Sequence, residues 1–371
     1  MNLSYWEIKN WLSHIDYVIV GSGIVGLNCA LRLKQRCPKS KVLVLEKGML
    51  PQGASTKNAG FACFGSISEI IDDLKYHSEI EVLDLIKKRI NGLQLLRETL
   101  GDETIGYQNL GGYELFLDSD DTLYNSCIEG QDDINQFLQP LFNTKVFYFK
   151  ENNIGFKKVK SKYCFNPFEG QIDTGKMMDA LLQKVQSLGV KILNNITVKA
   201  FFETLNSVKI ETDHFDFTAK KLCIATNGFS KQLNISGVKP ARAQVLITKP
   251  IENLHINGTF HLDEGYYYFR NIDNRILLGG GRNLDFKTEE TTVFRETDLI
   301  QNKLEDLLKT TIIPDIKFEI DHRWSGIMGV GKQKKPMVKQ VSNNVFCGVR
   351  LGGMGIAIGS SIGKALADLI D

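Results

Sequence analysis

The sequence predicts an α/β protein, because strand-like and helix-like patterns alternate along it with glycine-rich turns between them. A β-branched run at 17–20 passes through three glycines into a segment with apolar residues at helical spacing. A second apolar run, 41–46, follows and ends in an acid. Near the end of the chain, 344–370 again reads as strand, glycine-crowded turn and helix. These repeated units favour a Rossmann-like domain built on parallel strands.

The first glycine turn has the spacing of a dinucleotide-binding site. Gly21 would permit the tight turn, Gly23 would let a pyrophosphate approach the main chain, and Gly26 would let the helix pack on the strand. Glu46 lies 20 residues after Gly26, where an acid accepts hydrogen bonds from ribose hydroxyls. An acid in this place disfavours a 2′-phosphate and therefore NADP. The alternative, a tight turn that binds no ligand, leaves this acid and the second strand unexplained.

Composition and charge argue against several classes of protein. Lys and Arg number 45 and Asp and Glu 43, a balance that disfavours a nucleic-acid-binding protein. The seven cysteines form no pair with metal or redox spacing and the six histidines lie far apart, so we expect reduced thiols and no metal site. The N-terminus does not resemble a signal peptide, and no run approaches the roughly 18 apolar residues of a membrane span. We therefore expect a cytoplasmic protein without an integral membrane segment.

Several stretches, spread over nearly the whole chain, match one family in order. They are "VIVGSGIVGL" with Glu46, "GASTKNAGF" (53–61), the stretch 166–192, "KLCIATNG" (221–228), "RILLGGGR" (275–282), "WSGIMGV" (324–330) and "GVRLGGMGIAIG" (348–359). On these motifs the sequence resembles the FAD-dependent oxidoreductases of the D-amino-acid oxidase superfamily, the group of glycine oxidase and sarcosine oxidase.

The resemblance implies a noncovalently bound FAD and a chain shared between two interleaved domains. The FAD-binding domain is expected over 1–85, 155–230 and 324–371. The α+β substrate-binding domain, with a mixed and mainly antiparallel sheet, is expected over 86–154 and 231–323. The residues expected to contact FAD are Gly21, Ser22, Gly23, Ile24, Val25, Gly26, Glu46, Lys47, Ser55, Thr56, Lys57, Asn58, Ala59, Gly60, Val198, Thr226, Asn227, Gly228, Gly326, Arg350, Gly352, Gly353, Met354 and Gly355.

Two segments among these residues would contact the flavin ring. The small residues at 55–61 would let main-chain N–H groups reach the ring, and this segment has no histidine for a covalent link to flavin. Cys63 is the alternative residue for such a link. The turn at Gly352, Gly353 and Gly355 opens the last helix, whose positive end would stabilise the negative charge of a reduced flavin.

The resemblance implies oxidation of a C–N bond by hydride transfer to flavin N5, and an amino-acid substrate then needs a cation for its carboxylate. The arginines that could provide it are Arg242, Arg270, Arg282, Arg323 and Arg350. Arg350, in the loop before the flavin-facing turn, and Arg270, at the end of an aromatic strand, are favoured. Tyr268 is expected to form an aromatic wall, and His261 to accept a proton.

One departure from the family bears on the substrate. Glycine oxidase and its close relatives place a carboxylate-binding arginine in a Gly-Leu-Arg-Pro stretch after the tryptophan, whereas this chain has Met328 at that position. The pattern of Trp324, Gly326 and Pro336 is closer to the branch that oxidises polyamine-type amines. It favours an amine or a bulkier N-substituted amino acid as substrate.

The sequence thus predicts an FAD-dependent oxidoreductase that oxidises an amino acid or amine, with dioxygen or a quinone as electron acceptor. Two alternatives remain open. One is a 2-hydroxy-acid or glycerol-phosphate-type dehydrogenase on the same scaffold. The other is a flavin-bearing binding or tRNA-modifying module, of which the near-neutral charge disfavours the RNA version.

Overall fold

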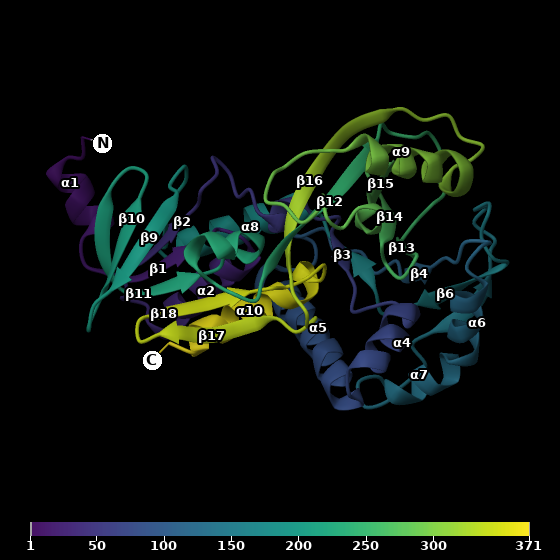
Figure 1. Cartoon of the computed structure of the whole chain (residues 1–371), viewed down its shortest axis with the longest axis horizontal. Helices are drawn as coiled ribbons and strands as arrows, with labels where there is room; N and C mark the ends of the chain where they lie inside the picture. Colours follow the sequence, from purple (N-terminus) through teal and green to yellow (C-terminus); the bar gives the residue numbers. More distant parts are fainter. Residues whose placement is uncertain (1, 371) are drawn as a thin grey trace.

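The computed structural model describes residues 2–370 of the chain. Within this range the strands form two sheets of eight strands each and one small two-stranded sheet. Figure 1 shows the first large sheet on the left and the second at the upper right, with a group of helices below the second sheet. The two sheets therefore lie side by side, and the chain passes between them several times.

The first sheet carries the parallel strands that the sequence predicts. Its strands are β1 (Ile15–Val20), β2 (Val42–Leu45), β8 (Lys191–Leu193), β9 (Val198–Glu203), β10 (Val208–Thr212), β11 (Asp216–Ile224), β17 (Met337–Ser342) and β18 (Val345–Val349). They run in the order β17-β18-β11-β1-β2-β8, and β10 and β9 extend antiparallel from β11. The pairs β18/β11, β11/β1, β1/β2 and β2/β8 are parallel, so the Rossmann-like prediction is confirmed.

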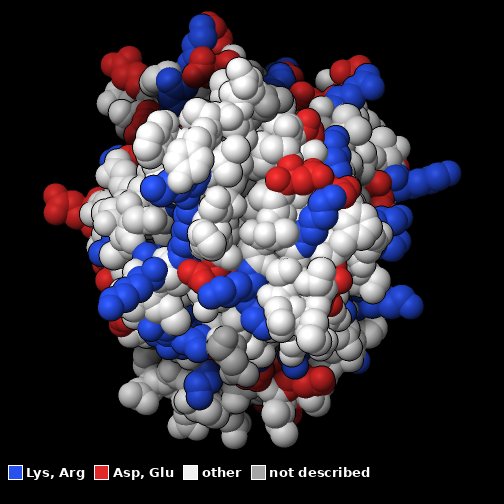
Figure 2. Space-filling model, turned by 90° about the vertical axis from the view of Figure 1, so that its left-hand side faces the viewer, with Lys and Arg blue, Asp and Glu red and all other residues white. Residues whose placement is uncertain are grey.

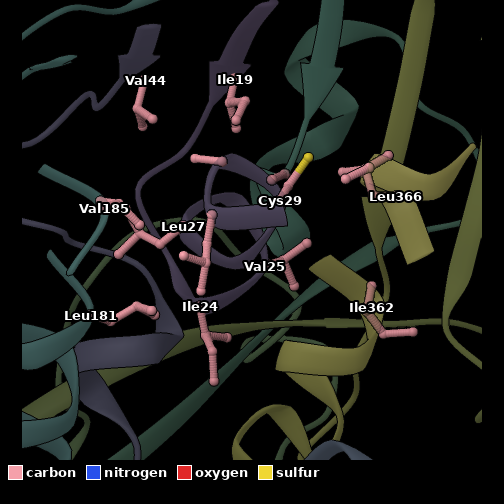
Figure 3. Close-up of a cluster of buried hydrophobic side chains, with 14 of the residues drawn as sticks. Ile19, Ile24, Val25, Leu27, Cys29, Val44, Leu181, Val185, Ile362 and Leu366 are labelled. Atoms are coloured by element: carbon pink, nitrogen blue, oxygen red, sulfur yellow. The ribbon is translucent and has the colours of Figure 1, made fainter. Parts of the chain in front are cut away.

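Helices cover this sheet and bury its apolar core. They are α2 (Ile24–Arg36), α5 (Glu79–Leu100), α8 (Thr174–Ser187) and α10 (Gly355–Asp368). α10 packs on both α2 and α5, and α8 packs on α2. Figure 3 shows side chains of β1, β2, α2, α8 and α10 meeting in one cluster, in which Ile19, Val44 and Leu27 are fully buried. This packing fixes the two glycine turns, at the start of α2 and of α10, against the same sheet.

The second sheet is mixed and mainly antiparallel, as predicted. Its strands are β4 (Gly112–Glu114), β5 (Tyr148–Glu151), β6 (Lys162–Asn166), β12 (Lys239–Thr248), β13 (Thr259–Leu262), β14 (Tyr267–Ile272), β15 (Arg275–Gly280) and β16 (Ile320–Val330). They run in the order β16-β12-β15-β14-β13-β4-β6-β5, and β13/β4 is the parallel pair. The assignment of the two sheets to an FAD-binding and a substrate-binding domain stays a prediction.

Shorter elements complete the chain. They are α1 (Tyr5–Glu7), a π-helical turn (Ile8–Leu12), α3 (Ala54–Lys57), β3 (Phe61–Ala62), α4 (Ile67–Tyr76), α6 (Asp121–Glu129), α7 (Gln131–Phe137), β7 (Gly170–Gln171), 3₁₀ turns (Asn227–Leu233 and Arg282–Leu284), α9 (Asp298–Leu307) and a second π-helical turn (Leu308–Ile312). α5 begins where Ser78 and Glu81 form a capping box.

Neither positive nor negative side chains dominate the surface of the face that carries the first sheet. Figure 2 shows acidic and basic side chains interspersed on this face, around a largely uncharged centre. This pattern agrees with the near-neutral net charge of +2. Among residues 2–370, no helix is both long enough and apolar enough to cross a membrane.

Candidate active site

A cavity of about 850 Å³ lies between the strand ends of the first sheet and one face of the second. All the residues that the sequence predicts for the site line this cavity except Ser22, Gly26, Thr56, Gly228 and Arg270. The glycine turns from opposite ends of the chain, at Gly23 and at Gly353, are therefore two walls of the same space. This position, outside the carboxyl ends of parallel strands, is where α/β sheets bind their ligands.

Close packing explains the first glycine turn. Gly21 has a φ of +105°, and a Cβ there would lie 2.8 Å from the carbonyl oxygen of Ala225 on the neighbouring strand end. A Cβ on Gly26 would overlap the carbonyl oxygen of Gly21. Gly23 faces the cavity, and the N–H of Ile24 donates to Ser55 Oγ at 2.9 Å. The turn thus presents bare main chain to the cavity at the start of α2, as a pyrophosphate requires.

Glu46 has a structural task beside the one predicted for it. Its carboxylate is 7% exposed and lines the cavity. Oε2 accepts hydrogen bonds from the N–H (3.0 Å) and Oγ (2.6 Å) of Ser22, and Oε1 accepts from the N–H of Gly48 (3.0 Å). Ser22 therefore acts through Glu46, whose carboxylate holds the glycine turn in place. The contact of Glu46 with a ribose stays a prediction.

The second glycine turn forms an open cradle. A Cβ built on Gly355 meets no atom within 4 Å, and one on Gly353 meets only Met328 Sδ, at 4.0 Å. Both positions line the cavity, so a side chain there would occupy cavity space. Asn227 Oδ1 holds the turn by accepting from the N–H groups of Arg350 (3.0 Å) and Leu351 (3.3 Å). A flat ring can approach the main chain at the start of α10, and the residues present fit a flavin.

Trp324 and Gly326 position the segment around α3. Trp324 Nε1 donates to the carbonyl oxygen of Lys57 at 2.9 Å, and a Cβ on Gly326 would lie 2.8 Å from Lys57 Cβ. Asn58 Oδ1 accepts from the N–H of Gly60 (2.7 Å) and from Thr174 Oγ1 (3.1 Å). Residues 57–60 are thereby fixed along one wall of the cavity.

The second sheet supplies the opposite wall. His261 on β13 and Tyr268 on β14 are paired in register, and Phe61 packs edge-on against both rings, at 5.1 and 5.7 Å between centroids. Burial lowers the pKa of His261, so its ring is neutral near pH 7, and its Nε2 has no partner within the described chain. Burial also raises the pKa of Tyr268 to about 12, which keeps its hydroxyl protonated.

Tyr266 also lines the cavity, whereas Tyr267 is 4% exposed and packs in the core on the other side of β14. The neutral imidazole and the protonated phenol are the groups on this wall that could hold a substrate proton or donate a hydrogen bond.

The five candidate arginines have different surroundings. The Arg350 guanidinium lines the cavity but donates to the carbonyl oxygens of Lys335 (3.0 Å) and Gly237 (3.3 Å). Arg270 is 2% exposed and lies outside the cavity lining. Arg242 is paired with Glu289, and Arg323 donates to Gln301 and Glu305. Arg282 lines the cavity.

Two buried carboxyls behind the cavity wall are absent from the sequence prediction. Glu169 Oε1 accepts from the N–H groups of Phe64 (3.0 Å) and Gly65 (3.3 Å), and Glu114 accepts from Ser66 and Ser68. Burial raises the pKa of Glu114 to about 7 and that of Glu169 to about 8. Both acids therefore fix the segment that follows Cys63 while they are wholly or partly protonated near neutral pH.

Replacing Glu169 with glutamine is expected to weaken the pH dependence of folding stability. The folded protein keeps the Glu169 proton up to about pH 8, whereas the unfolded chain loses it near the ordinary pKa of 4.5. The stability that the protonated group contributes is complete below that ordinary pKa and is lost as pH rises through the folded value. Urea unfolding at several pH values between 5 and 9 measures this slope, about 1.4 kcal/mol per pH unit for one group.

The exposed residue Glu129 provides the matched control, because Glu129→Gln should leave a curve parallel to that of the unmodified protein. Glu114 is unchanged in both variants, so its own contribution to the pH dependence of folding stability is the same in each. A Glu169→Gln curve with the unmodified slope would contradict the assignment of a protonated, buried Glu169.

A family model described as FAD dependent oxidoreductase matches residues 16–369. The chain belongs to this family. It is therefore an enzyme that depends on FAD, and the glycine cradle described above fits that cofactor. The sequence resemblance to this family is thereby confirmed.

Known proteins similar to this oxidoreductase cover nearly all of it. The "Probable oxidoreductase OrdL" of Haemophilus influenzae is 22% identical over 386 aligned residues, which cover 97% of this chain and 83% of the relative. Among solved structures, L-proline dehydrogenase from P. horikoshii superposes with a TM-score of 0.75 at 18% identity, covering 96% of this chain and 93% of that one.

Glycine oxidase from Geobacillus kaustophilus superposes equally well, with a TM-score of 0.75 at 19% identity and coverages of 96% and 94%. At these identities the solved structures establish the fold of this oxidoreductase, an α/β fold shared with an L-proline dehydrogenase and a glycine oxidase.

Proposed function

We propose that this oxidoreductase oxidises the C–N bond of an amino acid or amine, with FAD bound noncovalently in the 850 Å³ cavity. The observation that carries the proposal is the continuity of that cavity. One space joins the two glycine turns to the wall formed by His261 and Tyr268. FAD, when bound, supplies the hydride acceptor at its N5 atom. The names of the similar structures, glycine oxidase and L-proline dehydrogenase, support a substrate of this class.

The chain's own residues would bind, orient and deprotonate the substrate. The substrate nitrogen must lose its positive charge before the neighbouring C–H can leave as hydride. The unpartnered Nε2 of His261 is the neutral base on the cavity wall that can hold that proton. The protonated hydroxyl of Tyr268 can donate a hydrogen bond, and Phe61 packs edge-on against both rings.

Noncovalent attachment of FAD agrees with the surroundings of Cys63. Burial raises the pKa of this thiol well above its usual value, and Sγ lies 3.7 Å from Met354 Sδ. A thiol that stays protonated is a poor nucleophile toward a flavin.

We also assign the first sheet to FAD binding and the second sheet to substrate binding. The seven cysteines of the enzyme are all free, and we assign it a cytoplasmic location.

Anaerobic mixing of the purified yellow protein with candidate substrates tests this function. We expect the visible flavin absorbance to bleach with at least one compound among amino acids, N-methyl amino acids and polyamines, and not with 2-hydroxy acids or glycerol phosphate. Bleaching by a hydroxy acid alone would favour the dehydrogenase alternative. Admission of air or of a soluble quinone after bleaching then identifies which acceptor reoxidises the flavin.

A further inference from the structure

Two aromatic side chains are exposed on the helical segment that precedes the first sheet. This segment, residues 5–12, consists of α1 and the π-helical turn after it, and none of its residues is buried. Tyr5 and Trp6 are each 65% exposed, and Ile8 is 45% exposed. Figure 1 shows α1 at the outer left end of the molecule, away from the second sheet. Most of the surface of these three side chains, which we call the exposed patch, is therefore open to solvent.

The exposed patch is held in a defined arrangement. Ser4 and Glu7 form a capping box, in which the N–H of Ser4 donates to Glu7 Oε2 at 2.7 Å and the N–H of Glu7 donates to Ser4 Oγ at 3.3 Å. The rings of Tyr5 and Trp6 meet edge to face at 5.2 Å between centroids, and Lys9 Nζ lies 5.7 Å from each centroid. Side chains that are already ordered lose less entropy when they bind a partner, so this arrangement favours a contact.

Two lysines from the first sheet hold the other end of the segment. Lys41 Nζ donates to the carbonyl oxygens of Lys9 (3.3 Å) and Ser13 (2.6 Å), and Lys191 Nζ donates to that of Asn10. Cations suit the negative end of a helical segment. Residues 5–12 are therefore tied to the sheet by ammonium groups, which stay near the protein surface beside the exposed patch.

The charges next to the exposed patch are positive and lack acid partners. Within residues 2–370, Lys9, Lys41 and Lys191 form no ion pair. Burial and then the like charge of Lys191 lower the pKa of Lys41. Of the nearby acids, Asp16 is already paired with another lysine at 2.8 Å, and Glu7 closes the capping box. Over the whole of this face the charges are mixed (Figure 2), so the positive excess is confined to the surroundings of the patch.

This combination fits the boundary between a lipid bilayer and water. Tyrosine and tryptophan place an apolar ring and a polar edge at headgroup level, and lysines beside them attract anionic lipids. A stable complex between proteins buries about 800 Å² on each partner, which is more than three side chains at one end of a molecule provide. A bilayer needs no complementary shape, so a small protruding patch is sufficient for a contact with it.

We propose that this enzyme binds reversibly to the surface of anionic lipid bilayers through Tyr5, Trp6 and Ile8, with the surrounding lysines facing the headgroups. The proposal goes beyond the proposed function and does not depend on it. A single small apolar patch gives weak binding unless charge adds to it, and here the lysines supply that second contribution. None of residues 5–12 lines the cavity, so the contact uses a part of the chain separate from the candidate active site.

The test measures binding of the FAD-loaded whole chain to vesicles by flotation, at low and at high salt. One set of vesicles is phosphatidylcholine alone, and the other contains phosphatidylglycerol as well. The variants are Trp6→Ala, Trp6→Phe and Lys9→Gln. The matched controls are Tyr76→Ala, which removes an aromatic ring that is 76% exposed at the end of α4, and Lys317→Gln, which removes an exposed lysine. Neither control residue lines the cavity.

We expect the unmodified enzyme to bind vesicles that contain phosphatidylglycerol, less at high salt, and to bind phosphatidylcholine alone much more weakly. Trp6→Ala should lower the partition coefficient about 10-fold, and Lys9→Gln about fivefold. Trp6→Phe, which keeps an aromatic ring, should lose less than Trp6→Ala. Tyr76→Ala and Lys317→Gln should bind like the unmodified enzyme.

The proposal is overturned if the unmodified enzyme binds no vesicles, if Trp6→Ala binds as well as it does, or if neutral and anionic vesicles bind equally. Sedimentation velocity without lipid tests a second copy of the chain as the partner. A dimer that Trp6→Ala converts to a monomer would assign the patch to that interface and not to a bilayer. An unchanged ratio of flavin to protein absorbance shows that each variant is folded and loaded.

Discussion

Replacing Gly26 with alanine is expected to give a protein that purifies colourless. Gly26 does not line the cavity, but a Cβ there would overlap the carbonyl oxygen of Gly21. α2 would then have to move away from the end of β1, which displaces the bare main chain at Gly23. Overpacking of this kind costs typically about 1–3 kcal/mol, and the displacement falls on the turn that faces the pyrophosphate. The measurement is the ratio of flavin to protein absorbance after purification, with and without added FAD.

Gly175→Ala in α8 is the matched control. The atom nearest to a Cβ at Gly175 is Oδ1 of the N-cap residue Asp173, at 3.3 Å, so this side chain would need to shift by only a few tenths of an ångström. Alanine in a helix is favoured over glycine by about 0.5–1 kcal/mol, so this variant should be yellow and no less stable. A yellow Gly26→Ala protein with ordinary FAD affinity would show that the turn tolerates a side chain, against the close packing described here.

Replacing Glu289 with alanine is expected to cost about 3–5 kcal/mol of folding free energy. Arg242 and Glu289 form a bidentate pair whose side chains are 4% and 1% exposed, and Gln244 also donates to the carboxylate at 3.1 Å. Without Glu289 the guanidinium is left as an uncompensated charge in a site closed to water. Urea unfolding monitored by intrinsic fluorescence gives the difference.

Two further variants make this result interpretable. Asp132→Asn removes one member of an exposed pair with Lys145, whose side chains are 81% and 58% exposed, and should leave stability unchanged within error. The double variant Arg242→Met/Glu289→Leu removes both charges and should recover most of the lost stability. If Glu289→Ala unfolds at the same urea concentration as the unmodified protein, the pair is not closed to water.

Local patterns predicted the architecture well, because each relied on contacts between residues close in sequence. The apolar run at 41–46 appears as the strand Val42–Leu45, and the glycine-rich motif at 275–282 begins with the strand Arg275–Gly280. Between β14 and β15 the chain turns at Asp273 and Asn274, whose φ values are +49° and +57°, a conformation that these residue types tolerate. Asp173 accepts from the N–H of Lys176 and caps the start of α8, as its residue type favours.

The sequence did not predict the parts of the site that depend on contacts between residues far apart in the chain. Glu169 supports the main chain at Phe64, more than a hundred residues earlier, and nothing in its local pattern indicates this. The sequence could not tell the candidate arginines apart, because only their partners in the fold distinguish them. Arg242 pairs with Glu289, whereas Arg270 and Arg282 have no acid partner among residues 2–370. A useful signal for the cavity position of Arg282 was present in the three glycines before it, which resemble the turns that the sequence did assign to the cofactor.

The register of the first sheet has a consequence for how the molecule is made. β1 is central, yet Tyr17 pairs with Lys221, and Leu222 in turn pairs with Val345. A chain emerging from the ribosome therefore carries β1 and β2 with both outer edges open, because their partners β8 (Lys191–Leu193) and β11 (Asp216–Ile224) are made much later. The parallel strand β18 follows only at Val345–Val349. Open edges of this kind recruit other chains. We expect ribosome-bound nascent chains that end before β11 to need a chaperone to stay dispersed.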